Sequence, residues 1–392
     1  MNQKLIKDMK RDVKVPELVT KKMEDSIEQC MKMSPVSGKS KTKFHFSAAA
    51  CLLLALVLVG GGTAAAFAFH PWDKGVSDSM QLHDVREQNH LNETGLSEFP
   101  DQTVTINDVS ITATQTITDG DTCMIAFRVE GYQPKENLQP AFWDTTVTTD
   151  GERVDASYCA DFYDGTIQSS TGIVKNADGT PISKDSDGSL VFSYLREDGS
   201  MEYQILLQHT DTRQEFSDNK EGYFLNRSLH VELNGLGYYP GKAEEPVVEK
   251  EGVWSFDITL SGSPERKHFE PDIPIPDTDA TLVNVELSPI SIILKYRYPS
   301  KEALESSHTS EDTENASIGP FILGLKMKDG TIFPYVLGGG VNEWKDTTEI
   351  QKYTLDRIVN MDDVESLLFK KKDCDTLGSE MTLDCVHEIK IQ

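Results

Sequence analysis

The stretch Trp254-Ser255-Phe256-Asp257-Ile258-Thr259-Leu260 decides the fold class, because its apolar and polar side chains alternate strictly. A period of two residues places the apolar side chains on one face, which is typical of a half-buried β-strand. The same alternation recurs on both sides of this stretch, at Ile125, Phe127 and Val129, at Leu229, Val231 and Leu233, at Val283, Val285 and Leu287, and at Ile292, Leu294 and Tyr296. The chain is therefore predicted to be mainly β.

Turn residues define how these strands are connected. Asp-Gly pairs, which favour tight hairpins, occur at residues 119–120, 150–151, 164–165, 178–179, 187–188 and 198–199. Four prolines in residues 263–280 predict a stiff linker. We therefore expect two antiparallel β-sandwich-like domains, at residues 101–262 and 281–392, joined by this linker. One short helix is expected at residues 362–369, with Asn360 as its cap.

An uninterrupted apolar run, FSAAACLLLALVLVGGGTAAAFAF, occupies residues 46–69 and contains no charged residue. Its 24 residues would form a helix about 36 Å long, enough to span a hydrocarbon core. Lysines precede the run, whereas residues 70–84 carry more acidic than basic side chains, so we expect the N-terminus to be cytoplasmic and the C-terminal part extracellular, in a single-pass protein of the cell membrane. The competing interpretation is a cleaved secretory signal. Residues 70–100 are polar without a sustained period and are expected to form a stalk.

The first 45 residues are predicted to form a cytoplasmic amphipathic helical segment. Such a short segment cannot bury a core by itself, so its apolar stripe must dock on a partner protein, the membrane surface or a second copy. We favour a partner protein. The stripe consists of Val15, Leu18, Val19, Met23 and Ile27.

Charge divides the chain in the same way as hydropathy. Residues 1–46 are net basic, whereas the rest of the chain carries most of the acidic residues that give the net charge of −26. Binding phosphates requires clustered Lys and Arg, which the acidic part lacks, so we expect no nucleic-acid partner.

Four cysteines follow the apolar run: Cys123, Cys159, Cys374 and Cys385. Three pairings of four cysteines are conceivable. Cys374 with Cys385 is the favoured disulfide, because a short turn near Gly378 would bring them together; unpaired thiols are the alternative. No zinc-ligand spacing, calcium loop or short nucleophile motif is present, so we expect no metal, no cofactor and no enzymatic activity.

Three stretches carry a resemblance to a known family: VPELVTKKM at residues 15–23, VTINDV at 104–109 leading to IAFRVEG at 125–131, and VNVELSP at 283–289. In these the chain resembles anti-sigma-factor-like membrane proteins of Gram-positive bacteria that carry a domain of unknown function outside the membrane. The resemblance implies that the N-terminal helix holds a sigma factor inactive while the exterior domains sense envelope conditions. Zinc-containing members use a His-x-x-x-Cys-x-x-Cys helix, whereas residues 1–45 contain Cys30 alone, so sigma binding would be zinc-free.

The sequence thus predicts a regulator that couples an exterior sensor region to a cytoplasmic partner, with an extracellular ligand that the sequence does not identify. The alternative is an anchored envelope binding or adhesion module whose N-terminus only sets the topology. An enzyme acting on cell-wall polymers is a third interpretation.

Overall fold

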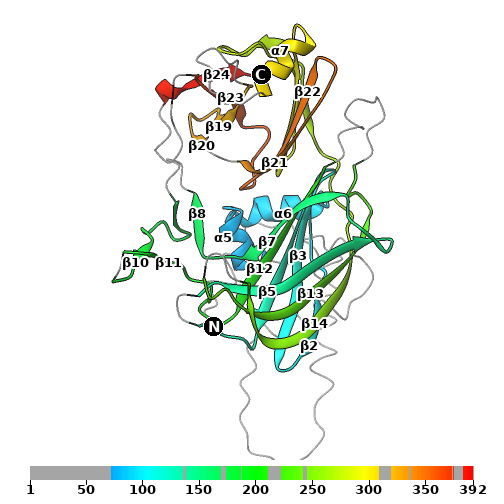
Figure 1. Cartoon of the computed structure of the whole chain (residues 1–392), viewed down its shortest axis with the longest axis vertical. Coiled ribbons are helices and arrows are strands. Elements are labelled where there is room, and N and C mark those ends of the chain that lie inside the picture. Colours follow the sequence, from blue (N-terminus) through cyan, green and yellow to red (C-terminus); the bar gives the residue numbers. More distant parts are fainter. Residues whose placement is uncertain are drawn as a thin grey trace, which may run out of the picture. The chain divides into compact units, whose positions relative to one another are not determined.

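The computed structural model describes residues 72–135, 138–168, 174–186, 188–210, 222–241, 245–308, 319–334, 337–372, 374 and 383–391. All of them belong to one compact unit. The fold is mainly β and its sheets are antiparallel, as predicted (Figure 1). Within this part of the chain, no helix is long and apolar enough to cross a membrane. The predicted span at residues 46–69 and the N-terminal helix lie outside the described residues.

The first two sheets pack face to face. The six-stranded sheet has the order β1-β3-β4-β12-β7, with β2 also paired to β3. Its strands are β1 (Ser97–Glu98), β2 (Gln102–Ile106), β3 (Val109–Thr118), β4 (Thr122–Glu130), β7 (Ala156–Phe162) and β12 (Met201–His209). The facing four-stranded sheet, β14-β13-β5-β6, consists of β5 (Pro140–Thr149), β6 (Glu152–Arg153), β13 (Ser228–Tyr238) and β14 (Val247–Thr259).

Alternation along β14 explains this packing. Trp254, Phe256 and Ile258 point into one core with Phe127 and Val231, while the intervening residues of β14 are exposed. The Trp254 indole Nε1 donates to the Val109 carbonyl at 3.2 Å and so joins the two sheets. We call residues 97–260 with this core the first β module. Two short hairpins, β8 (Thr166–Gln168) with β9 (Val174–Asn176) and β10 (Ser183–Lys184) with β11 (Leu190–Val191), extend from it.

A second hydrophobic core lies between the remaining two sheets. One sheet has the order β15-β17-β18-β22-β21, and β16 also pairs with β17. Its strands are β15 (Lys267–Phe269), β16 (Ile273–Pro274), β17 (Thr281–Leu287), β18 (Ser291–Arg297), β21 (Leu337–Lys345) and β22 (Thr348–Leu355). The other, β20-β19-β23-β24, contains β19 (Ile322–Met327), β20 (Ile332–Pro334), β23 (Val364–Lys370) and β24 (Val386–Lys390). Helices α7 (Lys301–His308) and η2 (Leu383–Cys385) complete this second β module.

The expected helix at residues 362–369 is wrong, because these residues lie mostly in strand β23. β23 is the inner strand between β19 and β24, and Val364, Leu367, Leu368 and Phe369 are all buried. Phe369 belongs to the core between the sheets, whereas Leu368 packs on the opposite face with Leu323 and Val386. Because both faces of β23 are buried, apolar residues follow one another at spacings that also fit the buried side of a helix.

Residues 72–98 differ from the stalk that we expected. They form α5 (Lys74–Ser79), α6 (Val85–Glu93) and β1 (Figure 1). Their apolar side chains cover the face of the six-stranded sheet that points away from the first core. Trp72, Val76 and Leu91 are buried there against Ile117 of β3 and Met124 of β4. We call this face of the six-stranded sheet the outer face. We expected residues 263–280 to form a linker between the domains. They are instead part of a sheet, because β15 and β16 pair with β17.

Candidate functional site

A cavity of about 300 Å³ lies over the outer face of the six-stranded sheet. Its apolar wall combines Ile117, Met124 and Leu206 of the sheet with Met80, the residue that caps α5. Ile290 and Leu355 of the second β module complete this wall. The cavity is thus formed by the first module, the N-terminal helices and the second module together.

Thr122, at the start of β4, lines the cavity and is only 1% exposed. Its hydroxyl has no hydrogen-bond partner among the described residues. The Tyr163 hydroxyl, also on the cavity wall, is likewise buried and without a partner there. Burial, with the nearby charges of Asp78 and Asp164, raises the pKa of Tyr163, so this phenol stays protonated and can donate. A buried polar group without a partner costs free energy, so both hydroxyls lower the stability of this region.

Three carboxylates line the cavity, those of Asp161, Asp164 and Asp356, and Asp356 pairs with Arg357 at 2.7 Å. Asp161 and Asp164 have other partners. Asp161 accepts from the Gln139 amide at 2.9 Å, and Asp164 accepts from the Thr166 hydroxyl at 2.7 Å, so both partners are neutral. No basic side chain of the described residues forms an ion pair with either carboxylate. Asp161 itself lies in the edge strand β7 and is exposed, which places the acidic end of the cavity at the solvent. Cys159 lies next to it, and burial and the charge of Asp161 raise the pKa of its thiol.

Helix α5 is bound to the six-stranded sheet at both of its ends. Before its first turn, the Asp73 carboxylate caps the helix by accepting from the Gly75 amide at 2.9 Å, and it also pairs with Arg196 at 2.6 Å. Arg196 in turn pairs with Glu202 of β12. At the last residue of α5, the Ser79 hydroxyl accepts from the Gln204 amide of β12 at 2.8 Å. Ser79 and Gln204 both line the cavity, so the hydrogen bond that anchors the end of α5 lies at its wall.

A buried polar cluster, which we call the polar joint, connects the two β modules. Its centre is Asp119, which is fully buried in the Asp-Gly turn between β3 and β4. The Asp119 carboxylate accepts hydrogen bonds from the hydroxyls of Ser288 and Ser291, both at 2.5 Å, in the turn between β17 and β18. Its other oxygen accepts from the Asp121 and Thr122 amides. One side chain therefore fixes both turns against each other.

Asp121 extends the polar joint to two cations of the second module. Arg266 Nη2 lies 2.6 Å from its carboxylate, and Lys352 Nζ, on the almost fully buried Lys352, lies 3.0 Å away. His209 Nδ1 is 3.8 Å away, too far for a strong hydrogen bond, and its ring stacks on Tyr223. Burial alone would raise the pKa of Asp121, but neighbouring His209, Arg266 and Lys352 together hold it far below its usual range. Asp121 is therefore ionised at every physiological pH.

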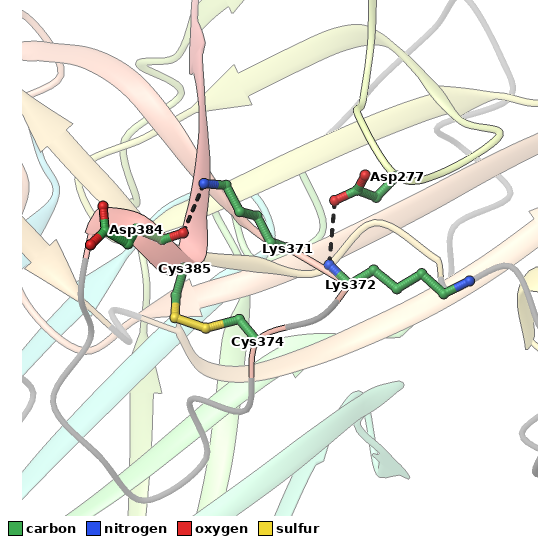
Figure 2. The surroundings of a disulfide bond; sticks show 6 residues. All are labelled: Asp277, Lys371, Lys372, Cys374, Asp384 and Cys385. Atoms are coloured by element: carbon green, nitrogen blue, oxygen red, sulfur yellow. Dashed lines mark hydrogen bonds between the residues drawn. A yellow bond between two sulfur atoms is a disulfide. The ribbon is translucent and has the colours of Figure 1, made fainter. Parts of the chain in front are cut away.

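Cys374 and Cys385 form a disulfide in the structure (Figure 2). Lys371 anchors the same region, because its amide donates to the Cys385 carbonyl at 3.0 Å and its Nζ donates to the Asp384 carbonyl at 2.7 Å. Asp277 accepts from the Lys372 amide and contacts His387 of β24 at 2.6 Å. The disulfide thus ties the start of β24 to the residues after β23. Cys123 and Cys159 are unpaired.

The partner-binding stripe predicted from the sequence, Val15, Leu18, Val19, Met23 and Ile27, lies outside the described residues. The cavity and the polar joint were not predicted. Among the described residues, no group of three or more His, Cys, Asp or Glu side chains could hold a metal ion. One signal was available: Cys123-Met124-Ile125-Ala126-Phe127 is apolar without interruption, which indicates a strand buried on both faces and hence a covering layer on the outer face.

Comparison with known proteins gives a family match for one segment in the N-terminal half of the chain. The model of a domain of unknown function (DUF4179) matches residues 38–131, which confirms the expected domain of unknown function. No curated protein matches the chain. Among solved structures, a conserved domain protein from Bacillus anthracis is similar at 16% identity and a TM-score of 0.39, over 72% of this chain and 81% of that one.

A second solved structure, the N-terminal periplasmic domain of ScsB from Proteus mirabilis, is similar at 10% identity and a TM-score of 0.20, covering 71% of this chain and 94% of that one. At these TM-scores, neither likeness bears on the fold or the function.

Proposed function

We propose that this protein is a single-pass membrane regulator, in which the β-rich unit senses a condition outside the membrane and a cytoplasmic partner receives the signal through residues 1–45. The sharpest form of this proposal is that the partner is a sigma factor, held inactive by the stripe that includes Val19 and Met23. The protein would act by binding, without catalysis.

The packing of α5 is the observation that carries this proposal. Residues 72–98 connect the apolar run at 46–69 to the β-rich unit, and they pack on the outer face instead of forming a free stalk. Ser79 and Met80 at the end of α5 also line the cavity. A change in the cavity would therefore move a helix that begins only five residues after the apolar run. A long flexible stalk would dissipate such a displacement, whereas a docked helix can transmit it.

The test is capture of partners by the full-length protein from a lysate of its source cell, with identification by mass spectrometry. Met23→Asp places a charge in the apolar stripe, and we expect it to abolish capture of a sigma factor that the wild type retains, since burying an unpaired carboxylate costs several kcal/mol. Lys21→Asp, on the opposite face of the predicted helix, is the matched control and should retain the partner. Equal capture by all three proteins would refute the stripe as the interface.

The alternative proposal is an anchored envelope binding module without a cytoplasmic partner. The cavity favours it equally, because a binding module also needs a ligand site. Deleting residues 1–38 separates the two proposals: the deletion abolishes signalling by a regulator, whereas it leaves the exterior binding of an anchored module unchanged.

A further inference from the structure

We propose that two hairpins of the first β module, β8–β9 and β10–β11, dock on the outer lipid surface of the membrane. We call their described residues, 164–168, 174–186 and 188–195, the hairpin arm (Figure 1). The surface that they contact is the headgroup region around the apolar run at 46–69. The inference rests on the membrane span of the proposed function and adds a second, separate contact with the bilayer.

The hairpin arm exposes apolar side chains that the described part of the protein does not cover. Val174, Leu190, Phe192 and Leu195 are each between 37% and 49% exposed. Of the arm side chains whose burial the structure describes, none is buried, so the arm has no core of its own. Two-stranded hairpins are marginally stable by themselves, and grouped exposed apolar side chains mark an interaction surface. The arm therefore needs a partner that buries apolar groups.

Chain length places this arm at the membrane. Only residues 70–71 separate the apolar run from Trp72, which is buried and donates its indole N–H to Asn92 at 2.9 Å. At no more than about 3.6 Å per residue, Asp73 lies within about 14 Å of the end of the run. Asp73 pairs at 2.6 Å with Arg196, the residue that follows the arm, and β8 contacts α5. The base of the arm is therefore held next to the bilayer.

Strand pairing in the arm gives one of its faces the chemistry of a membrane interface. Lys184 lies opposite Leu190 in the β10–β11 hairpin, so both side chains share a face, and Phe192 continues this face two residues further on. The apolar stem of a lysine can lie among such side chains while its ammonium group reaches the lipid phosphates.

The net charge of the arm indicates which force would hold it. Asp164, Asp178 and Asp185 outnumber Lys175 and Lys184 in its described part. Attraction to anionic lipid requires an excess of basic side chains. Docking therefore depends on apolar contact, and a zwitterionic lipid is sufficient for it.

The test uses the full-length protein in nanodiscs that hold one copy each, made of phosphatidylcholine brominated near the top of one acyl chain. Bromine quenches tryptophan fluorescence at short range. Phe192→Trp adds a tryptophan to the arm, and the wild-type emission is subtracted. We expect the added emission to fall by about half or more relative to unbrominated lipid, since interfacial apolar side chains reach about 5–10 Å into the headgroup and acyl boundary. Phe321→Trp, at an exposed position of the second β module, is the matched control and should not be quenched.

Two further substitutions, each combined with Phe192→Trp, test which face of the arm docks. Leu190→Asp places a carboxylate on the docked face, and we expect it to abolish the quenching because burying an unpaired charge is costly. Ser183→Asp adds the same charge to the same hairpin, but Ser183 pairs with Val191 and so lies on the opposite face. The quenching should persist in this variant.

Three results would overturn the docking: an unquenched Phe192→Trp, equal quenching of Phe321→Trp, or equal quenching in the two aspartate variants. Quenching that appears only after anionic lipid is added would reject the apolar contact. If the protein stays in the nanodiscs in these cases, the membrane span of the proposed function survives and only the docked arm is rejected. A protein that does not stay with the nanodiscs would overturn both the span and the docking.

Discussion

At the scale of single residues, Asp121 is the group whose ionisation matters most for stability. It compensates the charges of Arg266 and Lys352 in the polar joint, and Lys352 is only 1% exposed. Replacing Asp121 by Asn would leave these cations without their nearest carboxylate. We expect Asp121→Asn to lower the free energy of unfolding by about 3 kcal/mol at neutral pH, as for a broken buried ion pair. Urea unfolding of the full-length protein, followed by tryptophan fluorescence, measures this loss.

The pH dependence of that loss has a definite sign. The pKa of Asp121 is depressed in the folded protein, so its stabilisation is fully present above the unfolded-state pKa of about 3.9 and is lost as the pH falls below that value. The difference in free energy of unfolding between the wild type and Asp121→Asn should therefore become smaller as the pH falls below about 4. The exposed Asp144→Asn serves as the control. A difference that stays constant down to pH 3 would show that Asp121 acts through shape and not through charge.

At the scale of elements, α6 tests whether residues 72–98 are part of the folded unit. Leu91 is 7% exposed and packs on the outer face, whereas Val85 on the same helix is 59% exposed. We expect Leu91→Ala to lower the free energy of unfolding by about 2–3 kcal/mol because it leaves a cavity, while Val85→Ala should change it by less than about 0.5 kcal/mol. Equal, small effects in both variants would mean that the helix contributes little to the fold.

At the scale of the whole molecule, the polar joint should make the two β modules unfold together. Asp119 is fully buried and depends on Ser288 and Ser291 for two of its hydrogen bonds. Replacing both serines by alanine leaves one buried carboxylate oxygen of Asp119 without its donors, which costs about 1–3 kcal/mol or more of folding free energy. The lost hydrogen bonds all join the two modules, so the loss weakens their contact. We expect calorimetry of this double variant to show two separated transitions where the wild type shows one.

Ser228→Ala is the control for the double serine variant, because the Ser228 hydroxyl contacts Thr259 within the first module. It should keep a single transition. If the double variant also unfolds in one transition at a lower temperature, the modules are coupled by their apolar contacts, such as Ile290 with the N-terminal helices, and not by the polar joint.

The strand-rich fold and the core position of Trp254 followed from the amino-acid sequence alone, because a period of two residues is a local property of the backbone. The sequence also predicted the pairing of Cys374 with Cys385 seen in the structure, where the short separation limits the choices. The tertiary structure was needed to show that residues 362–369 lie mostly in a strand, that residues 72–98 form a docked layer, and that Asp119, within its hairpin turn, accepts a hydrogen bond from Ser288. These features depend on which face meets which partner elsewhere in the chain, and no local spacing encodes that choice.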